Sequence, residues 1–253
     1  MVTYPTLSIV TPTRNARKTL GQTIESIDSY GDDTEHLVID EHSQDGTREL
    51  VECHPRSKLA ATGVEGISKA MNVGIKLSTG KFVLILNADD QLHRDFTEVL
   101  HSLRTAPDDT IYHANAIQYD PVTKRSFEIE TNTRDLPKYM SIVHSSLFVP
   151  RQIYETMGCY SEDYMLAMDS EFVHRCLNKV KFEHIDLISS EMRLRGRSHI
   201  ATTSAMQEYK RSVLHHKLQG PIKAEFYRLR QTVLHSLLKI SLMQHLWTMR
   251  TSR

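Results

Sequence analysis

Two adjacent carboxylates follow directly on an apolar run in the stretch FVLILNADDQL, which covers residues 82–92. The five apolar residues 82–86 predict a strand that is buried on both faces. Asn87, Asp89 and Asp90 come immediately after it. Carboxylate and amide oxygens form a hard site that suits Mg²⁺ or Mn²⁺ carrying a phosphate better than zinc. Because Asp pairs are also common in solvated loops, these residues alone leave a metal–phosphate site and a surface loop as alternatives.

Two further predicted strands also end in polar residues. Residues 7–10 and 36–40 have the composition of short buried strands. The second of them ends on Asp40, and the first precedes a loop that contains Pro12, Thr13, Arg14 and Asn15. In a parallel sheet, ligands bind beyond the carboxyl ends of the strands. We therefore expect this loop, Asp40 and the carboxylates after residue 86 to lie at one edge of a sheet.

Predicted helices separate these strands. Apolar residues recur at helical spacing in residues 19–29, a short helix is expected to begin at Thr47, and residues 67–78 keep one helical face small or apolar. Gly80 is expected to follow the last of these helices as a left-handed cap, since glycine tolerates that conformation. Three consecutive strand–helix units predict an α/β fold with a mostly parallel, Rossmann-like sheet flanked by helices.

The pattern changes after residue 110. Residues 111–120 and 125–130 predict two strands of a more open, mixed sheet. The segment HSSLFV at 144–149 follows, then a helix that opens at Pro150 and another that begins at about Met168.

Composition places the chain among ordinary globular proteins. It has 253 residues, of which 40% are hydrophobic and 25% charged. Its three cysteines are scattered and lack C-x-x-C spacing, which disfavours a disulfide framework or a structural zinc site and suits a reducing cytoplasm. We expect no signal peptide and no transmembrane helix. Phosphate-binding P-loop, dinucleotide-binding G-x-G-x-x-G and G-x-S-x-G motifs are missing from the expected places.

Charge is distributed unevenly along the chain. Residues 205–253 contain nine Lys or Arg and two Asp or Glu, which leaves 22 basic and 29 acidic residues in the first 204. An acidic body with few aromatics in its basic tail disfavours a nucleic-acid partner. The tail also carries a helical apolar stripe, formed by Ile222, Phe226, Leu229, Val233, Leu237, Ile240, Met243 and Trp247. This stripe could pack on the protein's own body or on a second subunit, as in a homodimer, or it could lie on an anionic inner membrane leaflet.

The order of four segments resembles the family 2 glycosyltransferases. These are LSIVTPTRN, HLVIDEHSQDGT, GISKAMNVGIKLSTGKFVLILNADD and AMDSEFVHRC. The resemblance covers residues 6–200, is most specific at 66–90, and is strongest to the bacterial branch that builds colanic acid, exopolysaccharides, capsules and O-antigens. It implies a GT-A fold in residues 1–204, with a donor half at about 1–110, an acceptor half at about 111–204, and a basic amphipathic helical tail at 205–253.

The resemblance also implies roles for individual residues. Asp40 and the loop after the first strand correspond to the pocket for the donor's base and ribose, where Asp40 would accept a hydrogen bond from uracil. Asp89 and Asp90 correspond to the site of a Mn²⁺ or Mg²⁺ ion, and Asp169 to the catalytic base. The candidate donor contacts are Pro12, Thr13, Arg14, Asn15, Asp40, Lys69, Asn72, Asn87, Asp89 and Arg197. The candidate acceptor or diphosphate contacts are His144, Arg195 and His199, the last two in a basic loop that could equally be a solvated charge run.

These roles describe one reaction. A divalent cation at the carboxylates would neutralise the charge that develops on a nucleotide leaving group. Asp169 could take the proton of an attacking sugar hydroxyl, and a single in-line displacement inverts the anomeric carbon. We therefore expect a cytoplasmic, inverting transferase that uses a nucleotide sugar, UDP-linked by expectation, and a glycan or lipid-linked saccharide acceptor at the inner face of the membrane.

Two other functions remain as alternatives. A non-catalytic binding module could retain the same fold. A sugar-nucleotide pyrophosphorylase shares the general architecture but needs a glycine-rich loop after the first strand, and TPTRNARKTLG lacks those glycines. Glu41, Lys69 and the run Arg195-Gly196-Arg197 depart from the family pattern, which bears on donor and acceptor identity more than on activity.

Overall fold

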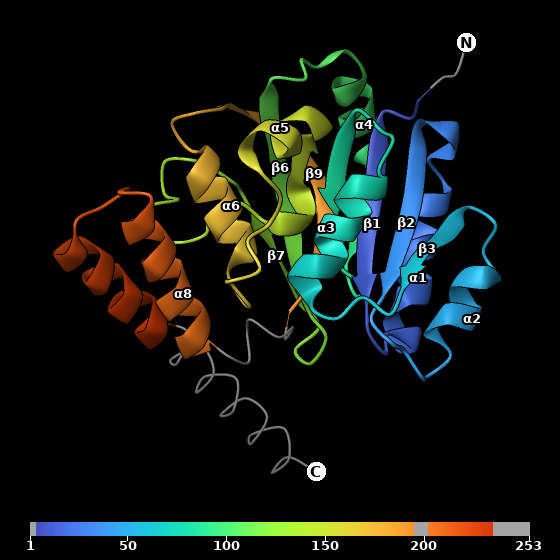
Figure 1. The fold of residues 1–253 in the computed structure, drawn as a ribbon, viewed down its shortest axis with the longest axis horizontal. Coiled ribbons are helices and arrows are strands. Elements are labelled where there is room, and N and C mark those ends of the chain that lie inside the picture. Colours follow the sequence, from blue (N-terminus) through green and yellow to red (C-terminus); the bar gives the residue numbers. More distant parts are fainter. Residues whose placement is uncertain (1–3, 195–201, 235–253) are drawn as a thin grey trace.

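A computed structural model of the chain describes residues 4–194 and 202–234. Within these residues the strands form one nine-stranded sheet in the order β3-β2-β1-β4-β8-β6-β9-β5, with β7 paired to β6 (Figure 1). The strands are β1 Leu7–Thr13, β2 Thr34–Asp40, β3 Ser57–Thr62, β4 Phe82–Ile85, β5 Gln91–Leu92, β6 Thr110–Asp120, β7 Arg125–Ile129, β8 Leu147–Pro150 and β9 Lys181–Arg193.

The helices cover this sheet and extend it on one side. They are α1 Arg17–Asp28, α2 Thr47–Glu52, α3 Ile67–Leu77, α4 Phe96–Thr105, α5 Arg151–Met157, α6 Met168–Cys176 and α8 Thr202–His215, with 3₁₀ turns η1 Gly31–Asp33 and η2 His144–Ser146. Residues 221–234 are also helical. The first half of the fold therefore has the alternating strands and helices that the sequence predicts.

The sheet is parallel in its first half and mixed in its second. Strands β3, β2, β1 and β4 run parallel, whereas β8 is antiparallel to both β4 and β6. β9 runs parallel to β6 and antiparallel to β5. This confirms the predicted α/β fold, in which a parallel sheet continues into a mixed one. The change of direction occurs at β4, the strand that carries the Asp pair.

Packing on both faces explains the uninterrupted apolar run of β4. Val83 and Ile85 pack with Met71 of α3 in one core cluster. Phe82 and Leu84 point to the opposite face and pack with Phe96 of α4 in a second cluster. Because successive strand residues alternate between faces, each position of β4 lies in one core or the other.

Gly80 is needed for a reason other than the predicted one. The expected left-handed cap was wrong: α3 ends at Leu77 with Ser78 in an extended conformation, and Gly80 is not among the glycines with positive φ. A Cβ at position 80 would instead lie 2.7 Å from both the backbone nitrogen and the hydroxyl of Ser8 in β1. Glycine is required there because two backbone segments approach too closely for any side chain.

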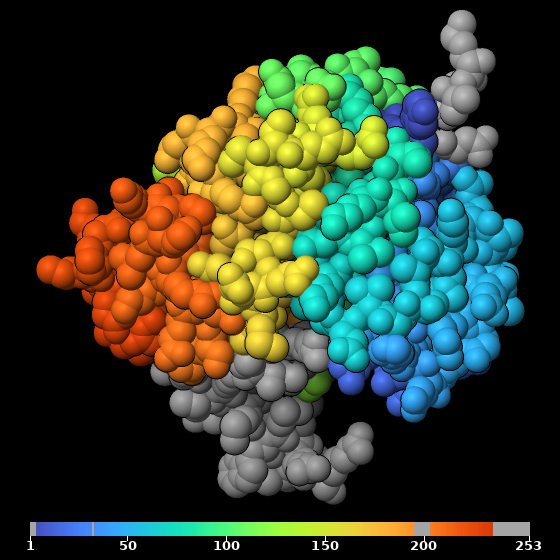
Figure 2. Space-filling model, in the orientation of Figure 1, coloured from blue at the N-terminus to red at the C-terminus, as the bar shows by residue number. Residues whose placement is uncertain are grey.

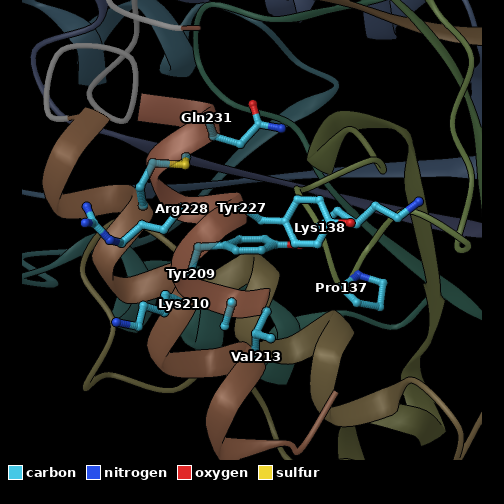
Figure 3. A pocket seen from close by; sticks show the side chains of 10 residues that line it. Pro137, Lys138, Tyr209, Lys210, Val213, Tyr227, Arg228 and Gln231 are labelled. Carbon is cyan, nitrogen blue, oxygen red and sulfur yellow. The ribbon is translucent and has the colours of Figure 1, made fainter. Parts of the chain in front are cut away.

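The two C-terminal helical segments pack on the body beside α6. Tyr209 and Val213 of α8 are buried together with Ala224 of residues 221–234, and the Ser212 hydroxyl lies 2.8 Å from Nδ1 of His174 in α6. A small groove between these two segments is lined partly by Tyr209, Val213 and Tyr227 (Figure 3). In the space-filling view their orange and red surface borders directly on the yellow surface of the body (Figure 2).

The other face of residues 221–234 is open. Side chains of the predicted apolar stripe are strongly exposed there: Ile222 by 87%, Phe226 by 61%, Leu229 by 48% and Val233 by 56%. The remaining stripe residues, from Leu237 on, lie outside the described residues. The first part of the predicted tail therefore packs on the protein's own body, while the described part of the stripe faces away from it.

Candidate active site

The two adjacent carboxylates after β4 occupy different environments. Asp90 is only 1% exposed. Its Oδ1 accepts a hydrogen bond of 3.0 Å from the Arg193 amide, and its Oδ2 accepts one of 3.2 Å from Nδ2 of Asn87. Burial, reinforced by the charge of Asp89, raises the pKa of Asp90 to about 7. The two oxygens of Asp90 thus join the end of β9 to the loop that follows β4.

Asp89 is half-buried and is the carboxylate that remains open to a ligand. Burial raises its pKa, while its own backbone amide and the Arg193 guanidinium oppose that shift. Among the residues that the structure describes, no three His, Cys, Asp or Glu side chains gather into a metal site. A hard oxygen ligand with open coordination suits a Mg²⁺ or Mn²⁺ ion whose other ligands come from phosphate oxygens and water. Asp89 fits that donor set better than Asp90, whose oxygens are already engaged.

The rim beside β1 and β2 is a connected set of loops. Asp40 is fully buried; it accepts hydrogen bonds from the Thr13 hydroxyl at 3.3 Å and from the Ser43 amide at 3.0 Å. Asn15 has φ of 51°, and its amide donates to the Ser43 hydroxyl at 2.8 Å. Asp40 therefore has a structural role in the turn that follows it, at the position where the sequence predicted a donor contact.

Side chains nearer the surface complete this rim. Arg14 is exposed, and its Nη1 lies 3.4 Å from Oε1 of Glu41. The same Glu41 oxygen accepts a hydrogen bond of 2.8 Å from the Gly66 amide, and Pro12 is half-buried beside this loop. Glu41, which departs from the family pattern, thus ties the Arg14 loop to the start of α3.

A second carboxylate, Asp169, stands in the first turn of α6. It is half-buried, and its Oδ1 accepts a hydrogen bond of 2.7 Å from the Ser170 amide. His144 lies close to it: burial lowers the pKa of His144, and the charge of Asp169 opposes that shift. The Nε2 of His144 is 3.0 Å from the Tyr160 hydroxyl. The structure therefore brings together two residues that were predicted separately, and it adds Tyr160.

The turn η2 connects the two carboxylate sites. Its first residue, His144, contacts the Tyr160 hydroxyl and lies near enough to Asp169 for that charge to influence its pKa. Its second, Ser145, is 1% exposed and its hydroxyl lies 3.1 Å from that of Ser190 in β9. A hydrogen bond from Ser145 also lowers the pKa of Asp90 against the effect of burial. Two neighbouring residues of one turn thus interact with two separate carboxylates, Asp90 and Asp169.

Comparison with known proteins identifies the family of this chain. The family model described as glycosyl transferase family 2 matches residues 8–156, more than half of the chain. The chain belongs to glycosyl transferase family 2. A PGL/p-HBAD biosynthesis glycosyltransferase of Mycobacterium tuberculosis is 29% identical over 189 residues, which cover 69% of this chain and 70% of that protein.

Solved structures share the fold of this glycosyltransferase. Staphylococcus aureus TarS 1–349 in complex with UDP-GlcNAc matches with a TM-score of 0.66 and 16% identity, over 87% of this chain and 69% of that one. Against the longer TarS structure the match covers 86% of this chain but 41% of that chain. The mannosyltransferase PcManGT of Pyrobaculum calidifontis, in complex with GDP-Man and Mn²⁺, matches with a TM-score of 0.64 and 17% identity, over 95% and 76% of the two chains. These likenesses establish the fold.

Two other predicted donor contacts of the glycosyltransferase lie in α3. Asn72 is buried, and its side-chain amide pairs with the backbone of Tyr160 through two hydrogen bonds of 2.9 Å. Lys69 is exposed, and its Nζ lies 3.9 Å from Oε2 of Glu162. Asn72 therefore attaches helix α3 to the segment that carries Tyr160. A donor contact by either residue stays a prediction.

Three predicted residues, Arg195, Arg197 and His199, lie outside the described residues. Sequence reasoning missed Ser145 and Tyr160, because neither belongs to a periodic pattern and their partners are far away in the chain. Only the position of Ser145 next to His144 could have drawn attention to it. In the described part of the glycosyltransferase, no helix is long and apolar enough to cross a membrane.

Proposed function

We propose that this glycosyltransferase transfers a sugar, with inversion, from a metal-bound UDP-sugar to a lipid-linked glycan acceptor during bacterial cell-envelope polysaccharide synthesis. The observation that carries the proposal is that one turn, η2, links the two strand and helix ends that bear Asp89 and Asp169. Ser145 of this turn interacts with Asp90, the neighbour of Asp89, and His144 lies near Asp169. One carboxylate suits the leaving diphosphate and the other the attacking hydroxyl. The related structures with UDP-GlcNAc and with GDP-Man and Mn²⁺ support a nucleotide-sugar donor and a divalent ion.

On the donor side, Asp89 would hold the Mn²⁺ or Mg²⁺ ion. The ion, when bound, neutralises charge that develops on the departing nucleoside diphosphate. Asp90 and Asn87 keep the β4 end in place through the contacts already described, and the loop of Arg14 and Asn15 forms the wall next to the base. The charge of the Arg193 guanidinium lowers the pKa of Asp89 against the effect of burial. This guanidinium supplies a positive charge beside the phosphates.

On the acceptor side, Asp169 accepts the proton of the attacking sugar hydroxyl. A carboxylate in the first turn of a helix lies favourably in the field of the helix dipole. The Ser170 amide donates a hydrogen bond to Oδ1 of Asp169 and orients its carboxylate. One base and one displacement at the anomeric carbon give a product of inverted configuration.

The exposed stripe supports a lipid-linked acceptor. Ile222, Phe226, Leu229 and Val233 form an apolar face, and the surrounding segment 205–253 carries nine basic and two acidic residues. This combination is typical of a helix that lies on an anionic membrane surface. The proposal therefore places the enzyme in the cytoplasm, peripherally on the inner face of the membrane, where its acceptor is anchored.

Hydrolysis and transfer assays test the proposal. Purified full-length protein is incubated with Mn²⁺ and a panel of UDP- and GDP-sugars, with release of nucleoside diphosphate as the readout and the anomeric configuration followed by NMR. We expect release with one UDP-sugar, loss of release on chelation, and an inverted product. Donor binding without turnover would favour the binding module, and formation of a sugar nucleotide from UTP and a sugar 1-phosphate would favour the pyrophosphorylase.

A further inference from the structure

A glutamate of α8 caps the segment that leads into α6. The carboxylate of Glu208 accepts hydrogen bonds from three consecutive backbone amides: from Met165 to Oε1 at 3.2 Å, and from Leu166 and Ala167 to Oε2 at 2.8 and 3.0 Å. Ala167 is the N-cap residue of α6 and makes no side-chain cap of its own. A residue 41 positions further along the chain therefore holds the three amides that lead into α6.

We propose that Glu208 is a positioning residue for Asp169, and that α8 is part of the catalytic unit. This inference rests on the proposed function, in which Asp169 is the base. Asp169 is the second residue of α6, so its position relative to the acceptor follows the entry angle of that helix. Hydrogen bonds to a carboxylate are charge-assisted and stronger than neutral ones. The negative charge of the Glu208 carboxylate also lies favourably near the N-terminus of α6.

The capped segment is held from both sides. Arg211 of α8 donates a hydrogen bond of 2.6 Å to the carbonyl of Asp163, and its guanidinium lies 3.9 Å from the centroid of the Tyr164 ring. From the donor half, the Ser68 hydroxyl of α3 donates to the carbonyl of Tyr164 at 3.2 Å. The approach to α6 is thus clamped between the donor half and α8, which fixes the distance between donor and base.

Catalysis is sensitive to such placement. A shift of about 1 Å in a reacting group can cost up to about 10²-fold in rate, even when the mutated residue is remote from the chemistry. Removal of Glu208 leaves three amides without their acceptor and lets the segment and the start of α6 move. Donor binding depends on Asp89 and the β1–β2 rim instead, so it does not depend on this clamp.

The test uses the full-length protein with Glu208→Ala and Glu208→Gln, with Asp169→Asn as reference. The donor is the nucleotide sugar that wild type hydrolyses fastest with Mn²⁺, with water as the acceptor. Calorimetric titration of the nucleoside diphosphate with Mn²⁺ gives the affinity and the fraction of competent sites. We expect kcat per binding site to fall at least about tenfold in Glu208→Ala, less in Glu208→Gln because one oxygen remains, and donor Kd to stay within about twofold.

Ser212→Ala is the matched structural control. Ser212 lies in the same α8–α6 interface and contacts His174, but it makes no hydrogen bond to residues 165–167. If α8 acts only by stabilising the protein, Glu208→Ala and Ser212→Ala should lower kcat per site to the same extent wherever they lower the melting temperature to the same extent. We expect Ser212→Ala to lower the melting temperature while kcat per site remains near that of wild type.

Hydrogen exchange supplies a readout that needs no activity. In Glu208→Ala, the peptide spanning residues 163–169 should exchange faster, whereas peptides from α3 and β4 should not change. Normal kcat per site in Glu208→Ala, or unchanged exchange of residues 163–169, overturns the inference. If Asp169→Asn is inactive in the same experiment, the proposed function still stands. Near-normal hydrolysis by Asp169→Asn, or no hydrolysis of any donor by wild type, overturns the proposed function and the inference with it.

Discussion

Asp89 and Asp90 are neighbours, yet their replacement should have separable consequences. Asp89→Ala removes a half-buried carboxylate that is open to a ligand, whereas Asp90→Ala removes one that is 1% exposed and accepts two hydrogen bonds. We therefore expect Asp89→Ala to lose metal-dependent donor binding in a stable protein. Asp90→Ala should lose stability.

The structure sets the size of the second effect. Without the Asp90 carboxylate, the Arg193 amide and the Asn87 side-chain amide have no acceptor. A buried donor left unpaired costs about 1–3 kcal/mol, so the free energy of unfolding should fall by about 2–6 kcal/mol in Asp90→Ala. At roughly 2–4 °C per kcal/mol for a chain of this size, the melting temperature should fall by at least about 4 °C. For Asp89→Ala, a partly exposed position, the change should stay below about 1 kcal/mol.

Two measurements on the same protein samples separate the roles. Thermal unfolding followed by circular dichroism gives the melting temperatures, and calorimetric titration of UDP with Mn²⁺ gives the affinity. Asp90→Asn serves as a control, because it keeps one acceptor oxygen and should be intermediate in stability. If Asp90→Ala melts like wild type but no longer binds UDP with Mn²⁺, Asp90 is the metal ligand and the division of roles is wrong. Normal binding of UDP and Mn²⁺ by Asp89→Ala would refute the division as well.

Three further predictions concern other parts of the protein. Burial lowers the pKa of His36 to about 3; since the unfolded chain binds the proton first, stability should fall as pH drops below 6.5, by about 2 kcal/mol at pH 5 from this residue. His36→Gln should flatten that fall in urea titrations at pH 7 and pH 5, and an unchanged slope would contradict it. Asn72→Ala should cost about 2–6 kcal/mol by leaving two buried backbone groups of Tyr160 unpaired; a normal melting temperature with weakened UDP binding would instead make Asn72 a donor contact. Ile222→Ser with Phe226→Ser should abolish salt-sensitive binding to anionic vesicles at an unchanged melting temperature, whereas conversion of a dimer to a monomer would identify the stripe as a subunit interface.

Local patterns in the sequence determine the first half of the fold. The apolar runs that become β1, β2 and β4 each end in polar residues, and the parallel arrangement of β1, β2 and β4 places those ends at one rim. Strand order along the chain therefore suffices to bring Asp40 and Asp89 to the same edge. The family resemblance, carried by residues 66–90 above all, then indicates the transferase class and the role of Asp169.

Strand β9 of the second half was not predicted from the sequence. Strand β9 has an irregular alternation of buried and exposed residues. It pairs with β6 along its whole length, with register shifts, and also with the short β5 at Ser190 and Glu191. Strands from distant parts of the chain determine which residues of β9 are buried, so the sequence of β9 alone does not show the alternation typical of a strand. Helix α4 and strand β3 were not predicted either.

Only the tertiary structure distinguishes side chains that the sequence treats alike. Asp89 and Asp90 are the same residue type at adjacent positions, and the side on which Arg193 and Asn87 approach makes one a support and leaves the other open. Glu208 is an ordinary surface residue of a helix until α8 packs beside residues 165–167. Burial and hydrogen-bond partners arise from contacts between segments far apart in the chain, and these contacts form only in the folded protein. Local sequence therefore determined the strands and their polar ends, and folding decided which of those polar groups remain free to act.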